Sequence, residues 1–445
     1  MKAIQYCKNF LKQYNHLCYT RRPLFLKPRN EFGVKKLVCT TIVPTQLPFY
    51  ELLDWPNIAE FLAGYLNYIK LKPPSELPQT LHAPQSVLER MYGHCFEYST
   101  VLCSMLIGAG YDAFVVSGYA TREVCRRDLS YTICPFVEQD QILNEAPPPD
   151  ELEGRRVHSW VMVLKGRRDV METFFIEPST GVAHPTSWDQ YLRIESLWNH
   201  LNYYVNMNET LDVASLNYDI GDSRHWEYVF AGQDLHIHYT ADEARHKKAA
   251  LALMGDNCPD ELFLDLPMSW CLPLKISRDD YDRKYPTGKR SRRYKYTILE
   301  DFCRYLNPDG MVRKLYVYSN LACTDISYTI CYFADRSDRL ESRFFHQQTG
   351  KIIEKFSEGR DDFLLEHHYY AFRIESESSR LMIFTEGKRT DELYRREEDA
   401  NYIRSYYKNR SDRKTFKESR FGPEGRILES PKILLPNPRP IETPQ

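Results

Sequence analysis

The chain has 445 residues and a net charge of −2 at pH 7. This length is enough for two or three domains, and an aromatic content of 13% excludes a largely disordered chain, because disordered segments contain few aromatic residues. The near-neutral charge excludes a chain that binds polyanions over its whole surface, and the lack of any uninterrupted apolar run of about 18 residues predicts no membrane-spanning helix.

The N-terminal third predicts a polar lead-in followed by the start of a mixed domain. Residues 1–32 break their apolar positions with Lys, Gln, Asn and His, so we expect them to lie outside a core and not to form a secretory signal. The run VKKLVCTTIVP (34–44) predicts a strand, and residues 58–69 predict a short helix with an apolar face.

A helix–strand–hairpin series comes next. A helix is expected from Cys95 to Gly108–Gly110, where glycine ends it, followed by the strand AFVVSGYA (113–120). The strands HSWVMVL and ETFFIEP are expected to form a hairpin around Lys165–Asp169. The bulky aromatic residues of 186–230 are expected to pack onto the same domain.

The C-terminal part has a different pattern. Short aromatic or β-branched runs between 285 and 384 predict hairpins that turn at Gly288, Gly310 and Gly350, with a weak repeat of about twenty residues. An unrelated antiparallel sheet is a nearly equal alternative. Residues after Glu386 mix both charges and predict an exposed helix up to Arg426, followed by a Pro-rich tail. The expected domains are 1–32 (lead-in), 33–231, 232–264 (linker with one helix), 265–385 (β-hairpin repeats) and 386–445 (charged tail).

Three residues, taken in chain order, could together form a catalytic site. Cys95 begins an apolar helix, where the helix dipole favours a thiolate. His158 opens a strand and could hold the ion pair, and Glu177 ends the next strand, from which it could orient the imidazole. Each residue alone is more often structural, but together they predict a Cys–His–Glu triad.

The segments GHCFEYSTVLCSMLIGAGYDAFVVSGYATREVC, RVHSWVMVL and ETFFIEPSTG resemble the papain-like, transglutaminase-type core. With IESLWNHLNYYVN, LEDFCRYLNPDGMVRKL and DELYRREEDANYIRSYYKNRSD, they are similar to one family in particular, subunit seven of the nexin–dynein regulatory complex, the Lobo homologue of motile cilia. The resemblance runs from about Phe32 to Pro423. It implies an α+β fold: a papain-like domain, an antiparallel β-hairpin repeat domain and a charged helical tail.

The sequence departs from this pattern at two positions of the site. Glu177 stands where the wider pattern has Asp, and Glu89 stands six residues before the cysteine, where papain-like enzymes often have a Gln that donates to the oxyanion. An ionised carboxylate only accepts hydrogen bonds, and losing one such donor typically costs about 10²–10³ in rate. Compared with the family, the insertion before the His is short, and no coiled coil follows the repeats in this sequence.

The resemblance implies a structural component of the axoneme in the cytoplasm and cytoskeleton of motile cilia, including sperm flagella. It would link doublet microtubules and regulate dynein-driven sliding. The implied partners are other subunits of the complex, tubulin and the inner dynein arms, with no nucleic acid, membrane or cofactor. The alternative is an active cysteine hydrolase or amide transferase that uses the triad. Residue identity alone leaves both readings open.

Three further features of the sequence could have a function. Seven basic residues interleaved with tyrosines could meet the acidic tails of tubulin or nucleic acid, or could form a solvated hairpin loop; they are Arg283, Lys284, Lys289, Arg290, Arg292, Arg293 and Lys295. His236 and His238 share a strand face but have no third ligand nearby, so no metal site is predicted. The twelve cysteines are scattered and show no zinc spacing, and we expect free thiols in a reducing compartment, where a Cys125–Cys134 bridge would not form.

Overall fold

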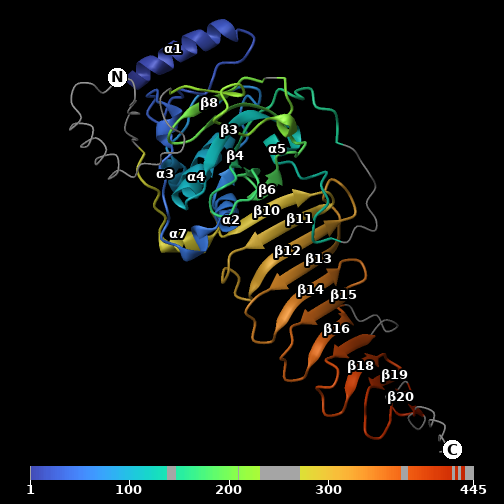
Figure 1. Ribbon diagram of the computed structural model, residues 1–445. Coiled ribbons are helices and arrows are strands. Elements are labelled where there is room, and N and C mark those ends of the chain that lie inside the picture. The colour runs from blue at the N-terminus through green and yellow to red at the C-terminus, as the bar shows by residue number, and fades with distance from the viewer. Residues whose placement is uncertain are drawn as a thin grey trace, which may run out of the picture. The chain divides into compact units, whose positions relative to one another are not determined.

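The computed structural model describes residues 2–137, 147–208, 210–230, 271–371, 379–422, 426–428 and 432–435 (Figure 1). The chain divides into two compact units. The first unit contains Met1–Asp128 and Pro148–Pro286, and the second contains Leu129–Pro147 and Thr287–Gln445. Helices and mostly antiparallel strands make the fold α+β, as the sequence predicts.

In the first unit, several helices accompany a sheet of seven described strands. Its helices are α1 (Lys2–Leu17), α2 (Trp55–Tyr65), α3 (Pro84–Arg90), α4 (Cys95–Gly108), α5 (Arg122–Arg126) and α7 (Arg278–Arg283), with 3-10 turns at Val38–Thr41, Tyr50–Leu53 and Val213–Ser215. The sheet has the order β6-β5-β4-β3-β7-β8-β9, and β1 (Asn67–Tyr68) pairs in parallel with β2 (Tyr92–Gly93). The sheet strands are β3 (Ala113–Ala120), β4 (Val157–Val163), β5 (Phe174–Glu177), β6 (Val182–Pro185), β7 (Tyr191–Trp198), β8 (Tyr203–Asn206) and β9 (Trp226–Tyr228).

The helix α4 packs against β3 and β4, and this contact forms the core of the first unit (Figure 1). Because side chains alternate across a strand, β4 contributes to two clusters: Val161 packs on the α4 side, and Trp160 packs in a second cluster with Phe175 and Tyr191. The predicted helix from Cys95 and the β4–β5 hairpin are therefore confirmed.

A close approach explains one glycine of this sheet. A Cβ at Gly118 would lie 2.1 Å from the main-chain oxygen of Arg193 on the neighbouring strand and 2.6 Å from the ring of Trp160. Only glycine lets β7 and the indole ring approach β3 at this point.

Two expectations for the N-terminal part are wrong, and a third is confirmed with different bounds. Residues 34–44 form a 3-10 turn at Val38–Thr41 and no strand, because the N–H of Val38 bonds the carbonyl of Leu26 and the turn closes on itself. The helix expected over 58–69 spans Trp55–Tyr65. The lead-in also contributes to the core, since Phe25 and Leu26 are buried in the same cluster as α4.

The second unit is one antiparallel sheet whose described strands follow one another in chain order, from yellow to red in Figure 1. The strands are β10 (Lys289–Tyr294), β11 (Thr297–Phe302), β12 (Met311–Tyr318), β13 (Ile326–Phe333), β14 (Leu340–His346), β15 (Lys351–Phe356), β16 (Leu364–Tyr370), β17 (Arg380–Phe384), β18 (Leu393–Glu398), β19 (Tyr402–Tyr407), β20 (Phe416–Arg420) and β21 (Lys432–Leu434). Cys134, from the segment that follows the first unit's α5, is buried with Tyr294 and Leu315 of this sheet.

The charged tail is not a helix where the structure describes it. Residues 393–420 continue the hairpin series as β18, β19 and β20. The mixed charges that resemble a solvated helix form pairs both between and within these strands: Arg404 on β19 donates to Glu418 on β20 over 2.6 Å, and Arg395 pairs with Glu397 within β18. The turn prediction is also wrong at Gly288, which precedes β10, while the β10–β11 turn contains Tyr296 at φ +54°. Gly310 and Gly350 do lie in turns between strands.

An Arg-x-Asp motif recurs in the turns that follow β13, β15, β17 and β19, and its contacts join successive hairpins of the repeat. The side chains of Arg336, Arg360, Arg389 and Arg410 each bond the carboxylate of the Asp two residues later. Each also donates to the main-chain oxygen of the corresponding Asp one repeat earlier, at 2.7, 2.9, 3.1 and 2.8 Å, respectively.

The same four arginines lie over aromatic rings at the ends of the preceding strands, Phe333, Phe356, Phe384 and Tyr407. Each arginine therefore joins two successive hairpins through a carboxylate, a carbonyl and a ring. The residue after each Asp has a left-handed backbone conformation and is Arg339, Phe363, Glu392 or Arg413 instead of glycine. The spacing of glycines therefore predicts this repeat poorly.

Candidate functional site

The start of α4 holds the candidate nucleophile. His94 is extended, and its N–H donates to Glu97 Oε2 at 3.1 Å, so the helix begins with Cys95 as its first residue. A thiol at this position meets the positive end of the helix dipole. The side chain of Cys95 is completely buried.

His158 and Glu177 lie on the neighbouring strands β4 and β5 and bond one another, with 2.8 Å between His158 Nε2 and Glu177 Oε2. Glu177 also accepts from the hydroxyl of Tyr191 at 3.0 Å and from the N–H of Ser179 at 3.1 Å. Both members of the pair are buried. The carboxylate is therefore held by three donors, and the imidazole is fixed in one orientation.

The charges of the pair follow from two opposing effects. Burial lowers the pKa of His158, but the Glu177 carboxylate and, after it, Cys95 outweigh burial, so the pKa stands well above its ordinary value. Burial raises the pKa of Glu177, but His158 and the donors of Ser179 outweigh it, so that pKa is lowered. Both directions favour an imidazolium–carboxylate pair over a neutral one.

The thiol is near this pair without bonding it. Cys95 contributes to the pKa of His158, yet His158 Nδ1 has no hydrogen-bond partner among the described residues. His158 lies on the strand face of Trp160, whose ring centroid is 6.3 Å away, whereas Cys95 belongs to the cluster on the α4 side. A thiol–imidazole hydrogen bond, and the triad as a catalytic unit, stay predictions.

A second thiol, which sequence reasoning did not connect with the site, lies close to His158. Cys125 on α5 is buried, with its Sγ 3.9 Å from the carbonyl oxygen of Val157, and its own carbonyl accepts from Tyr68 at 2.8 Å. The spacing of α5 in the sequence gave no signal for this approach. Cys125 and Cys134 are both free and lie in separate clusters.

A role of Glu89 in the oxyanion region stays a prediction. The Glu89 side chain is exposed on α3 and accepts a hydrogen bond from Gln85 at 3.0 Å. The buried carboxylate beside the helix start is instead Glu97, which bonds Arg90 and His82 in addition to the His94 N–H. Burial raises the pKa of Glu97, but these partners outweigh it and lower the pKa to about 2. A Glu three residues after the helix cap, as in a capping box, was the signal that could have identified it.

Aromatic residues surround the start of α4. Phe96 and Tyr98 are buried, whereas Tyr92 is half exposed under the guanidinium of Arg90. The ring of Trp160 stacks on Tyr191 with 4.0 Å between centroids and closes the other side of the His158–Glu177 pair.

The basic stretch from Arg283 to Lys295 does not form a single solvated loop. It begins at the end of α7, in the first unit, and continues into β10, in the second. Most of its cations have internal partners: Arg283 bonds Asp280, Lys284 bonds Glu60, Lys289 bonds Glu300, Arg292 bonds Asp301, and Arg293 donates to the carbonyl of Leu321. Lys295 is buried. Internal partners therefore neutralise or occupy much of the positive charge of this stretch.

The proposed histidine pair, His236 and His238, and the linker 232–264 lie outside the described residues. Within the described ranges, no group of three His, Cys, Asp or Glu side chains is arranged to hold a metal ion. Nor does any helix there have the length and apolar character needed to cross a lipid bilayer.

Comparisons with known proteins bear on both units. Residues 286–443 match the family model of the dynein regulatory complex subunit 7 MORN domain, and residues 151–229 match that of the CEP76 peptidase-like domain. The chain is similar to dynein regulatory complex subunit 7 of Homo sapiens (34% identity, 98% of this chain), Bos taurus (35%, 98%) and Xenopus tropicalis (35%, 97%). Each match covers 56% of the relative, so the chain spans about half the length of these curated relatives.

Proposed function

Because this chain belongs to the dynein regulatory complex subunit 7 family, we propose that it is a structural component of the nexin–dynein regulatory complex. In this role it helps to link doublet microtubules in the axoneme of motile cilia and flagella and to regulate dynein-driven sliding. Its partners are other subunits of the complex, the doublet microtubules and the inner dynein arms. The support is the similarity over almost the whole chain, together with the subunit-specific family model over the second unit.

The first unit is papain-like, of the transglutaminase type, in this proposal. The peptidase-like family model covers β4 and β5, which carry His158 and Glu177. A helix that begins with a cysteine and packs on an antiparallel sheet with a His–Glu pair agrees with that assignment.

The complete burial of Cys95, His158 and Glu177 is the observation that carries the structural role. A reacting carbonyl must approach a nucleophile to about 3–3.5 Å. The Cys95 side chain has no exposed surface to which such a group could come. No observation of the site favours the alternative, a hydrolase or amide transferase, over a retained fold element.

Cys95→Ser is therefore expected to leave folding, axonemal incorporation and motility unchanged, because serine has nearly the same volume and removes only the nucleophile. Cys103→Ser is the matched control, since Cys103 is equally buried on the same helix, eight residues after Cys95. Cells that carry only one of the variants are compared for motility and for the amount of protein in isolated axonemes. The opposite outcome is a Cys95→Ser protein that assembles in normal amounts in cells that do not swim, while Cys103→Ser cells do swim. That result would support an enzymatic role and contradict the structural one.

The contact with tubulin is proposed to use the basic stretch, in which Arg293 is exposed and Arg290 is half-buried. Arg292 is excluded from the test because it bonds Asp301, which also accepts from Arg313 at 2.7 Å, so changing it would disturb the sheet. Arg290→Glu with Arg293→Glu is expected to weaken co-sedimentation with microtubules at low salt. The loss should shrink as salt rises, because Coulomb attraction is screened over about 10 Å at 0.1 M.

The control for this test is Lys165→Glu with Arg167→Glu, the same change of charge on the exposed β4–β5 turn. Equal losses in both double variants would show that net charge alone matters, and unchanged binding of the Arg290/Arg293 variant would remove the stretch as a contact.

A further inference from the structure

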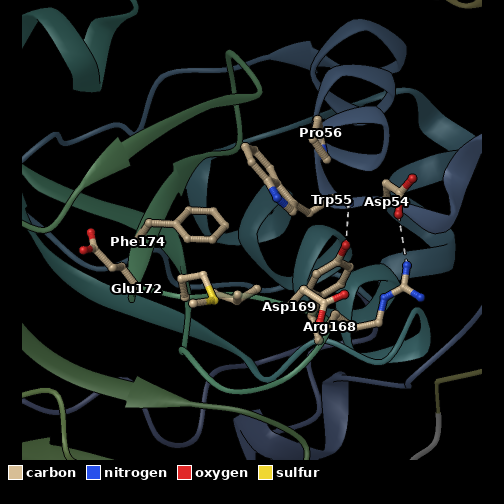
Figure 2. A pocket seen from close by; sticks show the side chains of 10 residues that line it. Asp54, Trp55, Pro56, Arg168, Asp169, Glu172 and Phe174 are labelled. Carbon is tan, nitrogen blue, oxygen red and sulfur yellow. Dashed lines mark hydrogen bonds and ion pairs between the residues drawn. The ribbon is translucent and has the colours of Figure 1, made fainter.

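A hollow of about 510 Å³ in the first unit lies between the start of α2 and the β4–β5 turn (Figure 2). The rings of Trp55 and Phe174 line it, with 4.9 Å between their centroids. Cys95, His158 and Glu177 are not among its lining residues. The hollow therefore gives no access to the triad, and the cover over Cys95 is formed by other segments of the unit.

One of these segments begins with β1 and is bonded to the chain directly before Cys95. β1 pairs in parallel with β2. The N–H of Asn67 donates to the carbonyl of Met91 at 2.8 Å. The N–H of Ile69 donates to the carbonyl of Gly93, also at 2.8 Å, and Gly93 lies two residues before Cys95. The segment is thus held as an extended strand at the start of α4.

The same segment is bonded to the chain directly before His158. The carbonyl of Pro74 accepts from the N–H of Val157 at 2.9 Å, and Val157 is the residue before His158. Between the two attachments, the side chain of Leu71 is half-buried and packs on the core cluster of α4. Residues 67–74, here called the strap, therefore run from the cysteine side of the site to the histidine side.

Tyr68 is the strap residue that fills space at the site. Its ring meets that of Tyr98 edge-on, with 5.9 Å between centroids, and Tyr98 lies on the first turn of α4, three residues after Cys95. Its hydroxyl donates to the carbonyl of Cys125 at 2.8 Å. Burial and, after it, Cys95 and Glu177 raise the pKa of Tyr68 well above its ordinary value, which agrees with a ring placed near both groups.

We propose that the strap covers the triad in the way that a bound extended peptide would, and that its release is the step that makes Cys95 accessible. Extended peptides bind as added strands, through main-chain hydrogen bonds and side chains that fill neighbouring space. The strap does both, with main-chain bonds to Gly93 and Val157 and with the ring of Tyr68. The proposal concerns access to the site and does not depend on the axonemal role.

Release of the strap is expected to need less free energy than unfolding of the first unit. β1 has only two residues, and the side chains of Lys70, Lys72 and Pro73 are exposed. Segments with few buried contacts open locally while the rest of the domain stays folded. Local release would expose Cys95, whereas Cys103, equally buried further along α4, becomes accessible only when the helix itself unfolds.

The test is thiol labelling of the folded full chain with dilute iodoacetamide, with the rate at each cysteine read by tandem mass spectrometry. In the unchanged protein, Cys95 should be labelled slowly, but faster than Cys103. Tyr68→Phe removes only the hydroxyl that bonds the Cys125 carbonyl. It should speed the labelling of Cys95 about 5-fold, the effect of losing one hydrogen bond, and leave Cys103 unchanged. Ile69→Pro, which removes a main-chain donor of the strap, should act in the same way.

Tyr218→Phe is the matched control, because the Tyr218 hydroxyl also donates to a carbonyl, that of Val213, elsewhere in the first unit. It should leave both rates unchanged. The proposal is overturned if Cys95 reacts as fast as an exposed thiol or no faster than Cys103. It is also overturned if Tyr68→Phe speeds both cysteines equally, or if Tyr218→Phe speeds Cys95 as much.

Discussion

Trp160→Ala is expected to lower the free energy of unfolding of the first unit by about 3–5 kcal/mol, the usual cost of emptying a large buried aromatic site. The indole ring is fully buried, stacks on Tyr191 at 4.0 Å and touches Phe175 edge-on at 6.0 Å. The backbone cannot close the gap easily, since β3 and β7 already approach each other as closely as Gly118 permits. A loss of this size is a large share of the stability of a typical domain.

The measurement is urea unfolding followed by tryptophan fluorescence. All six tryptophans of the chain lie in the first unit, so this signal reports on that unit even if the two units unfold separately. Trp160→Phe should lose less, because a ring still fills part of the site. Trp188→Ala, at a half-buried ring that stacks on His184, is the control for removing an indole and should cost clearly less. Equal losses at the two tryptophans would contradict the prediction.

Glu177→Ala is expected to cost a similar amount, about 3–5 kcal/mol, because removing one partner leaves the other charge buried and unpaired. His158 would lose its bond to Oε2, and the hydroxyl of Tyr191 would lose its acceptor in the same pocket. Glu177→Gln should cost less, since an amide oxygen can still accept one of these bonds. The double variant His158→Leu with Glu177→Leu should lose less than the sum of the two single changes, because the pair then disappears together.

The dependence on pH gives this prediction a second readout. The pKa of Glu177 is lowered on folding, so its contribution is fully present above the ordinary carboxyl value of 4.5 and is lost as pH falls below it. The pKa of His158 is raised, so its contribution is present below 6.5 and lost only as pH rises towards the raised value. The stability gap between the unchanged protein and Glu177→Ala should therefore narrow below pH 4.5. A gap that is constant from neutral pH into this range would show that the pair is neutral in the folded protein.

Local sequence determined much of the first unit around the candidate site. The helix from Cys95, the strand AFVVSGYA and the β4–β5 hairpin were all predicted, because apolar periodicity, a terminating glycine and a turn act within a few residues. Cys95 at a helix start, and His158 and Glu177 on adjacent strands, follow from the same short-range signals. The α+β class follows from them as well.

Only the tertiary structure decided which charges are used and which groups are accessible. The tail strands β18–β20 look like a solvated helix in sequence, but Arg404 on β19 pairs with Glu397 on β18 and with Glu418 on β20, and no local pattern contains such contacts between strands. Glu89 and Glu97 differ by eight positions, yet one is exposed and the other buried beside the helix start, because packing of α3 on α4 sets their depth. The burial of Cys95, which separates a scaffold from an enzyme in our proposal, likewise depends on residues distant in the chain, among them Phe25, which closes over α4 with its ring centroid 4.8 Å from that of Phe96. Hydrogen bonds and burial between distant segments arise only in the assembled fold. A local sequence pattern shows which residues could take part in them, but not which partners they meet.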